Sequence, residues 1–321
     1  MAFLWRAACL RRALSLLVRW LGEFGGMTWT RVATAAVLIP FVVGLVLYGS
    51  TAWVAVILAA IIALAMIEYF ALGDAIGHRA YKVWTTVCAL LLVAAQWAAA
   101  QVAASSANSY SLWGFRLQHE VAGLASNLGS PLDVLFLFVC GFAVVAMATK
   151  RPLVETLPAA GISSSALLMV AVPLSFAIRL HGYGKVGPKL LLFALVITWA
   201  GDTAAYFVGR AIGKHPFAPL LSPKKTWEGA VASFAGSLLV GVGFAWWTGI
   251  PLASMLPMAG VGNVAGQIGD LVESAYKRSA GVKDSGTLLP GHGGILDRID
   301  ALILAIPVVW YYWILFAVKP V

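Results

Sequence analysis

Residues 270–300 read DLVESAYKRSAGVKDSGTLLPGHGGILDRID, and this polar stretch separates two long apolar segments. It holds four of the 22 basic residues of the chain and five of the 13 acidic ones, together with a GHGG turn. The chain on either side is strongly hydrophobic, and charged groups persist in such surroundings mainly where they have a function. We therefore expect two helices that carry polar side chains, joined by a glycine-rich loop.

The composition of the whole chain is that of an integral membrane protein. Of its 321 residues, 61% are hydrophobic and 11% are charged, whereas a soluble domain carries about 25% charged residues. The net charge is +9, but the basic residues occupy short segments between apolar runs. That distribution fits the positive-inside bias and the binding of anionic phosphate groups, and it argues against nucleic acid as a partner. The three cysteines show no zinc-site spacing and no disulfide framework.

Apolar segments long enough to cross a hydrocarbon core of about 30 Å occur nine times. They lie near residues 31–49, 51–72, 82–103, 132–148, 158–180, 187–209, 229–247, 252–270 and 301–318. The sequence therefore predicts an all-α polytopic integral membrane protein, with about nine transmembrane helices and a polar cavity that faces the cytoplasm.

The chain divides into three predicted regions. Residues 1–26 are basic, and arginines interrupt their apolar run, which predicts an amphipathic helix on the membrane surface. The alternative is an extension that precedes a second translation start at Met27. Residues 27–186 hold the N-terminal transmembrane helices, with an external loop and a short helix expected over 105–130. Residues 187–321 form the predicted catalytic transmembrane region with its cytoplasmic loops.

The distribution of Lys and Arg predicts the orientation of the chain. With the N-terminus inside, 17 of these residues fall in inner segments and five in outer ones. Loops with such a surplus stay in the cytoplasm, although the loop 180–189 argues weakly for the opposite orientation. We expect a multi-pass protein of the cell (inner) membrane, with the 270–300 stretch on the cytoplasmic side, where nucleotides are.

Asp202 lies deep in an apolar segment, in the run LVITWAGDTAAYFVGR at residues 195–210. A carboxylate at this depth is costly and marks a functional position by default. Helical spacing places Asp202, Tyr206 and Arg210 on one face. Two interpretations remain open, namely contact with a substrate and a structural pair between Asp202 and Arg210.

The run SPKKTWEG at residues 222–229 precedes another apolar helix. Lys224 and Lys225 in a cytoplasmic loop suit a polyphosphate or a lipid phosphate, and Glu228 lies where a helix N-terminus favours negative charge. Alternatively, the two lysines only keep this loop on the cytoplasmic side, and the rest of the run marks the start of a helix. The helix itself carries a stripe of small residues for close packing against another helix: Gly229, Ser233, Ser237 and Gly241.

Polar side chains line one face of the helix that enters the 270–300 stretch. Spacings of three or four place them together: Asn263, Gln267, Asp270, Ser274 and Lys277. Asp297 and Asp300 share a face at the start of the next helix. Two carboxylate-bearing helices with nearby bases can hold Mg²⁺ and a polyphosphate, because Mg²⁺ prefers one or two carboxylates plus phosphate oxygens. A loop rich in structural salt bridges is the alternative.

The 270–300 stretch contains the pattern S-x-x-K-R-x(4)-K-D followed by P-x-H-G-G-x-x-D-R-x-D. This pattern resembles the signature of the phosphatidate cytidylyltransferases, or CDP-diacylglycerol synthases. Its fixed positions are all filled: Ser274, Lys277, Arg278, Lys283, Asp284, Pro290, His292, Gly293, Gly294, Asp297, Arg298 and Asp300. The Gly269–Asp270 pair, the SPKKTWEG run and the GDTAAYFVG run also look like those of the family, and Tyr276 is a mild departure. The likeness is strongest from residue 187 onward, weaker over 27–186 and absent over 1–26.

The resemblance implies a membrane enzyme that converts CTP and phosphatidate into CDP-diacylglycerol and pyrophosphate and that needs Mg²⁺. It implies that Asp270 and Asp297 hold the metal and that both act in catalysis together with Lys277. The expected substrate-binding residues are Asp202, Ser222, Lys224, Lys225, Thr226, Ser274, Arg278, Lys283, Asp284, His292, Arg298 and Asp300. The expected partners are CTP, phosphatidate in the bilayer and membrane lipids; a second, monovalent cation and a homodimer stay open.

Two other functions compete with this interpretation. A cytidylyltransferase that acts on an isoprenoid lipid phosphate is compatible with the same signature. An ion-coupled transporter would also use an intramembrane carboxylate such as Asp202. The transporter is disfavoured because the sequence shows no inverted repeat and because its charge lies in a cytoplasmic loop.

Overall fold

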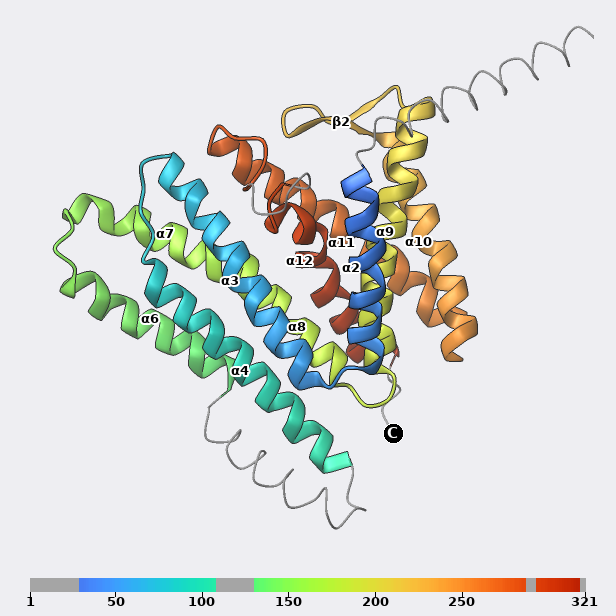
Figure 1. The fold of residues 1–321 in the computed structure, drawn as a ribbon, viewed down its shortest axis with the longest axis horizontal. Coiled ribbons are helices and arrows are strands. Elements are labelled where there is room, and N and C mark those ends of the chain that lie inside the picture. Colours follow the sequence, from blue (N-terminus) through green and yellow to red (C-terminus); the bar gives the residue numbers. More distant parts are fainter. Residues whose placement is uncertain (1–28, 108–129, 287–292, 318–321) are drawn as a thin grey trace, which may run out of the picture.

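The computed structural model describes residues 29–107, 130–286 and 293–317. The predicted amphipathic helix at 1–26, most of the predicted loop at 105–130 and His292 lie outside the described residues. Within them, the chain forms helices and one small hairpin (Figure 1). The helices are α2 (Trp29–Tyr48), α3 (Thr51–Ala75), α4 (Lys82–Ala107), α6 (Pro131–Ala148), α7 (Thr156–Ala166), α8 (Val172–His181), α9 (Gly187–Ile212), α10 (Trp227–Thr248), α11 (Leu252–Ser279) and α12 (Leu296–Tyr312).

Short non-α segments extend several of these helices. A 3₁₀ turn at Leu153–Glu155 precedes α7, a π-helical turn at Leu167–Ala171 joins α7 to α8, and another at Trp313–Ala317 follows α12. The segment from Leu153 to His181 therefore runs as one long span.

Seven helical segments in the described part of the chain are long and apolar enough to cross a membrane. They are Thr51–Ala75, Lys82–Val102, Pro131–Ala148, Leu153–His181, Gly187–Ile212, Trp227–Thr248 and Leu296–Ala317. The chain is thus an α-helical, multi-pass membrane protein, as the sequence predicts. The two other predicted spans are α2, whose apolar helix is found over the shorter Ala36–Tyr48, and α11, which carries polar residues along one face.

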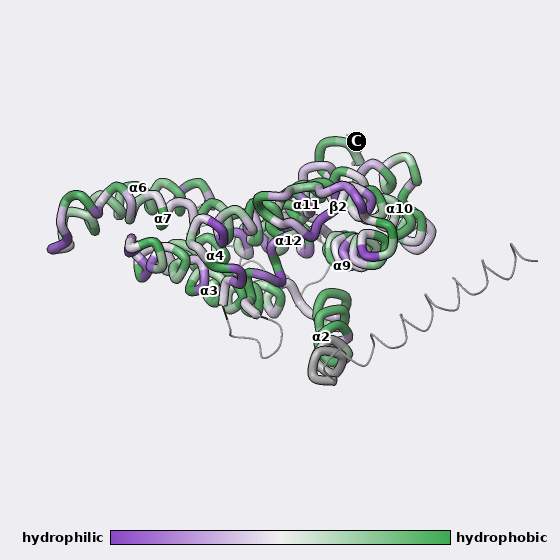
Figure 2. Tube along the Cα trace, turned by 90° about the horizontal axis from the view of Figure 1, so that it is seen from above, coloured by the Kyte–Doolittle hydropathy of each residue, from purple (hydrophilic) through white to green (hydrophobic). Residues whose placement is uncertain are grey.

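The helices form two groups joined by α8. One group contains α3, α4, α6 and α7, and the other contains α9, α10, α11 and α12 (Figure 1). Helix α8 packs against α3 and α4 on one side and against α9 and α12 on the other. Figure 2 shows α2 outside both groups, where it contacts α9 and α3.

Local sequence signals set the ends of several helices. The side chain of Ser50 accepts a hydrogen bond from the backbone N–H of Trp53 at the start of α3. Ser130 and Asp133 form a capping box at the start of α6. Gly249 ends α10 in the left-handed conformation, with φ of 74°, which glycine adopts without steric cost. These capping residues satisfy backbone groups that helix ends leave free.

A two-stranded antiparallel hairpin between α9 and α10 was not predicted. Its strands are β1 (Pro216–Ala218) and β2 (Ser222–Thr226), paired Pro216 to Thr226 and Ala218 to Ser222. Strands of three and five residues that contain prolines and lysines carry no alternation of apolar and polar residues. The hairpin therefore has no periodic signal in the sequence, and the all-α prediction is incomplete at this point.

The predicted stripe of small residues on α10 is buried against neighbouring helices. Gly229, Ser233, Ser237 and Gly241 are all buried. Asn263 of α11 donates hydrogen bonds from Nδ2 to the Ser233 hydroxyl at 2.9 Å and the Ser237 hydroxyl at 2.8 Å. On α9, a Cβ atom at Gly201 would lie 2.6 Å from Asn263 Nδ2 and 2.7 Å from Ser233 Oγ. Three helices thus meet closely around one polar network.

The substitution Gly201→Val is expected to separate these three helices. The added side chain would displace the Asn263 amide, and overpacking of this kind costs about 1–3 kcal/mol of unfolding free energy. Thermal unfolding in detergent should show a lower midpoint than in the unmodified protein. Gly243→Ala on α10 is the control, because nothing lies within 4 Å of a Cβ atom there; equal midpoints for the two variants would contradict the prediction.

Candidate active site

Lys277 of α11 lies between two carboxylates. Its Nζ atom is 2.6 Å from Asp297 Oδ1 and 2.6 Å from Glu273 Oε2. Lys277 is 8% exposed and Glu273 is 3% exposed, while the Asp297 side chain is 10% exposed. Buried charges of this kind are stable only when they are paired. The structure therefore joins the predicted residues Lys277 and Asp297 directly, and it adds Glu273 to them.

Asp297 also accepts backbone hydrogen bonds from both sides of the glycine-rich loop. The Ser285 N–H lies 3.1 Å from Asp297 Oδ2, and the Gly294 N–H lies 2.9 Å from the same oxygen. Asp297 stands in the first turn of α12, where the helix dipole favours a negative charge. Gly293 has a φ of 80°, which glycine adopts without strain. The side chain of Asp297 is therefore held in one orientation.

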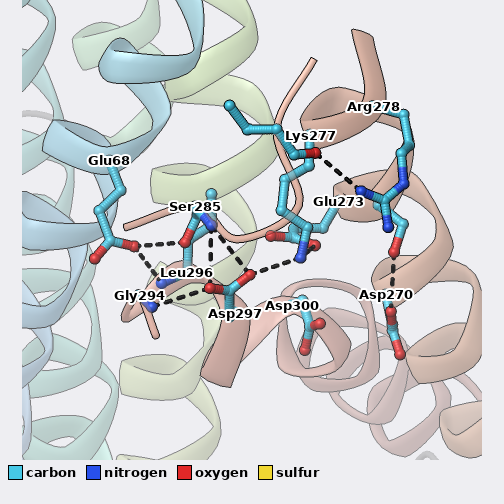
Figure 3. A network of polar contacts seen from close by, with 12 residues as sticks. Glu68, Asp270, Glu273, Lys277, Arg278, Ser285, Gly294, Leu296, Asp297 and Asp300 are labelled. Atoms are coloured by element: carbon cyan, nitrogen blue, oxygen red, sulfur yellow. Dashed lines mark hydrogen bonds and ion pairs between the residues drawn. The ribbon is translucent and has the colours of Figure 1, made fainter. Parts of the chain in front are cut away.

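Glu68 of α3 contacts the same loop, and sequence reasoning did not identify it. The residue is 6% exposed. It accepts hydrogen bonds from the Ser285 hydroxyl at 2.8 Å and from the backbone N–H groups of Ile295 and Leu296, both at 2.9 Å. Figure 3 shows Glu68 reaching from α3 toward this loop. The only available signal was an acidic residue inside an apolar segment, which marks a functional position by default.

A second group of charges surrounds Asp270 of α11. Lys225 Nζ lies 2.5 Å from Asp270 Oδ2, and the Ser274 hydroxyl lies 3.4 Å from Asp270 Oδ1. Asp202 of α9 and Asp300 of α12 lie near Asp270. Among the described residues, Asp202 and Asp300 form no ion pair, so this group holds three carboxyl groups and one lysine. On the predicted shared face of α9, Arg210 Nη1 donates a hydrogen bond to the Tyr206 hydroxyl at 3.0 Å.

The hairpin brings the predicted SPKKTWEG residues to α11, but it gives them different environments. Lys225 reaches Asp270, whereas Lys224 is exposed, because successive side chains of a strand point to opposite faces. The Thr226 hydroxyl accepts a hydrogen bond from the Gly229 N–H at 3.2 Å and begins α10. Ser222 lies at the start of β2. Of the two predicted lysines, only Lys225 therefore joins the carboxylates.

The remaining predicted residues lie around the end of α11 and the loop that follows. Arg278 donates hydrogen bonds to the carbonyl of Leu221, at 3.2 Å, and to that of Val282, at 3.0 Å, and so connects the hairpin to α11. Lys283, Asp284 and Arg298 are exposed. The predicted polar face of α11 is confirmed inside the helix group, since Gln267 Nε2 donates to Asn263 Oδ1 at 2.7 Å.

The fold and these charged groups fit a membrane-bound enzyme that acts on substrates with phosphate groups. The chain belongs to the cytidylyltransferase family, whose family model matches residues 29–316. It is 34% identical over 217 residues to the phosphatidate cytidylyltransferase of Bacillus subtilis (strain 168), an alignment that covers 64% of this chain and 77% of that protein. It is 38% identical over 200 residues to the phosphatidate cytidylyltransferase of Brucella suis biovar 1 (strain 1330), covering 60% of this chain and 70% of that protein.

Proposed function

We propose that this protein transfers the cytidylyl group of CTP to phosphatidate, producing CDP-diacylglycerol and pyrophosphate in phospholipid biosynthesis. Membership of the cytidylyltransferase family and the names of its relatives support this activity. The observation that carries the proposal is the pairing of Lys277 with Asp297 and of Lys225 with Asp270, at positions of the motifs that resemble those of the family. The ion-coupled transporter has no comparable support.

The carboxylates of the site fit a divalent cation by charge and by donor type. Within the described residues, no group of three or more His, Cys, Asp or Glu side chains could hold a metal by itself. Mg²⁺ characteristically binds one or two carboxylates and completes its shell with phosphate oxygens and water. The surplus of carboxyl groups over lysines around Asp270 would favour a cation there. Asp270 and Asp297 would hold the ion, and bound Mg²⁺ would neutralise charge on the phosphates of CTP.

The chain's own residues would act by positioning and by charge neutralisation. An oxygen of the phosphatidate phosphate attacks the α-phosphorus of CTP and forms the new P–O bond. The bond from the α-phosphorus to the bridging oxygen breaks, and its electron pair leaves with pyrophosphate. A phosphate monoester is anionic near neutral pH, so no strong general base is required. Lys225 and Lys277 supply positive charge where the transferred phosphoryl group develops negative charge.

The proposed topology has nine crossings, with α2 and α11 added to the seven apolar spans. The hairpin and the loop after α11 would then face the cytoplasm across the inner membrane. The surplus of Lys and Arg in the segments on this side supports that orientation. CTP would reach the site from the cytoplasm, while phosphatidate would enter it from the bilayer.

Pyrophosphate release from CTP tests the proposed reaction. Purified full-length protein in detergent is supplied with Mg²⁺ and with phosphatidate, diacylglycerol, an isoprenoid lipid phosphate or no lipid. We expect release with phosphatidate at least about 100-fold above release with diacylglycerol or without lipid, because a site built for a phosphate group rejects a lipid that lacks one. Phosphatidate should also exceed the isoprenoid lipid phosphate, and CDP-diacylglycerol should be the product. Faster release with the isoprenoid lipid phosphate would support the alternative cytidylyltransferase, and release without any lipid phosphate would contradict both.

A further inference from the structure

Glu68 provides the cap of a helix that has no cap of its own. The N-cap position of α12 is Ile295, and its side chain makes no capping hydrogen bond. The backbone N–H groups of Ile295 and Leu296 instead donate to Glu68 Oε1 and Oε2, each at 2.9 Å. The first N–H groups of a helix have no partner inside the helix, and a carboxylate at this end is favoured by the dipole. A side chain from α3 therefore completes the start of α12.

The carboxylate of Glu68 also lies against the backbone at both ends of the glycine-rich loop. A Cβ atom at Gly286 would lie 2.7 Å from Glu68 Oε1, and a Cβ atom at Gly294 would overlap first with Ser285 Oγ and then with Glu68 Oε2. Real Cβ atoms do not approach other heavy atoms so closely. Glycine at these two positions is thus explained by the proximity of the buried carboxylate and, at Gly294, of the Ser285 hydroxyl that it binds.

Two short connections lead from Glu68 to Asp297. Ser285 donates its hydroxyl to Glu68 Oε2 and its backbone N–H to Asp297. Gly294 donates its N–H to Asp297, and the adjacent Ile295 N–H goes to Glu68. Both backbone donors that orient Asp297 are therefore held by Glu68, directly or through the neighbouring residue (Figure 3).

We propose that Glu68 is a positioning residue of the cytidylyl transfer. It holds Ser285, Gly294 and the start of α12 in the arrangement in which Asp297 meets Lys277. The inference rests on the proposed function of Asp297 and extends it, because it assigns a role in the reaction to the N-terminal group of helices. Glu68 acts through Asp297 and does not itself contact the substrate.

Two substitutions separate this role from a purely structural one. Glu68→Gln keeps one carbonyl oxygen but loses the charge and one acceptor, and Ser285→Ala removes only the hydroxyl connection. Loss of such supporting hydrogen bonds typically lowers activity about 10–100-fold. We expect Glu68→Gln to lower kcat within this range with little change in KM for CTP, and Ser285→Ala to have a smaller effect in the same direction. The double variant should be no slower than Glu68→Gln alone, because both changes interrupt one connection.

Asp74→Asn is the matched control, since Asp74 is an acidic residue of the same helix and pairs with exposed Lys82. It should leave kcat unchanged. Tryptic cleavage after exposed Lys283 gives a second measurement that does not depend on activity, and Glu68→Gln should accelerate it severalfold. If Glu68→Gln fails to fold, Ser285→Ala still tests the proposal by its kcat and by its cleavage rate.

The outcomes distinguish this inference from the proposed function. Normal kcat in Glu68→Gln and Ser285→Ala, with an inactive Asp297→Asn, would overturn the positioning role and leave the proposed function intact. Normal kcat in all three variants would overturn the positioning role of Glu68 together with the catalytic role assigned to Asp297. A lower thermal midpoint with unchanged kcat at lower temperature would show that Glu68 serves stability alone, which also overturns the inference.

Discussion

Asp297→Asn is expected to lower kcat by about 10³-fold, the upper range for loss of one preorganised electrostatic group in an active site. Asp297 meets Lys277 at 2.6 Å and is proposed to hold Mg²⁺. An asparagine has nearly the same shape and keeps one oxygen for the backbone N–H groups of Ser285 and Gly294. It lacks the charge needed for the ion and for Lys277. The rate of pyrophosphate release at saturating CTP and phosphatidate measures the effect.

The folded state should survive this change. Lys277 retains its ion pair with Glu273, so no buried charge is left without a partner. The thermal midpoint in detergent should therefore stay within a few degrees of the unmodified protein, since about 1 kcal/mol shifts the midpoint of a mid-sized protein by about 2–4 °C. Asp74→Asn repeats the same chemical change at an exposed position and should retain full activity. Near-normal turnover in Asp297→Asn would contradict the role assigned to this carboxylate.

Lys277→Met should have the largest effect on stability. The substitution removes the cation shared by Glu273 and Asp297, and breaking a buried ion pair costs about 3–5 kcal/mol because a charge is left uncompensated. We expect little monodisperse protein after extraction into detergent, and no measurable turnover. Size-exclusion chromatography and the thermal midpoint report the first effect, and pyrophosphate release reports the second.

Two further variants make the Lys277 prediction specific. Lys82→Met removes a lysine from the exposed pair with Asp74, and such pairs contribute about 1 kcal/mol or less. The double variant Glu273→Gln/Lys277→Met removes one of the two uncompensated carboxylates, so it should recover much of the folded protein without recovering turnover. A Lys277→Met protein as stable as Lys82→Met would show that the pairing is not needed for the fold.

Features that depend on helical periodicity were predictable from the sequence. The polar face of α11 and the small-residue stripe of α10 repeat every three or four residues, and the structure places them in one buried network with Asn263 at its centre. The approach of α11 to α12 followed from two adjacent helices joined by a loop, although the direct contact of Lys277 with Asp297 was not itself predicted. Such patterns lie within short stretches of the chain, so they can be recognised in a single sequence.

Features that depend on contacts between distant segments were not predictable in this way. Glu68 meets its partners across more than 200 positions of sequence, and no pattern in the chain reports that pairing. Glu273 was not assigned to the site from the sequence, because spacing alone does not show that one lysine contacts two carboxylates. The hairpin was not predicted, because its short strands have no periodicity. The different orientations of Lys224 and Lys225 depend on the hairpin, so they were not predicted either.

The position of Glu68 has a consequence for the order in which the protein is made. Ribosomes synthesise α3 long before Ser285 and α12, so the first helices are inserted while the partners of this carboxylate do not yet exist. An acidic side chain without partners is costly inside a membrane. Glu68 therefore gains its partners only after α12 has been synthesised, and this late contact joins the N-terminal group of helices to the C-terminal one.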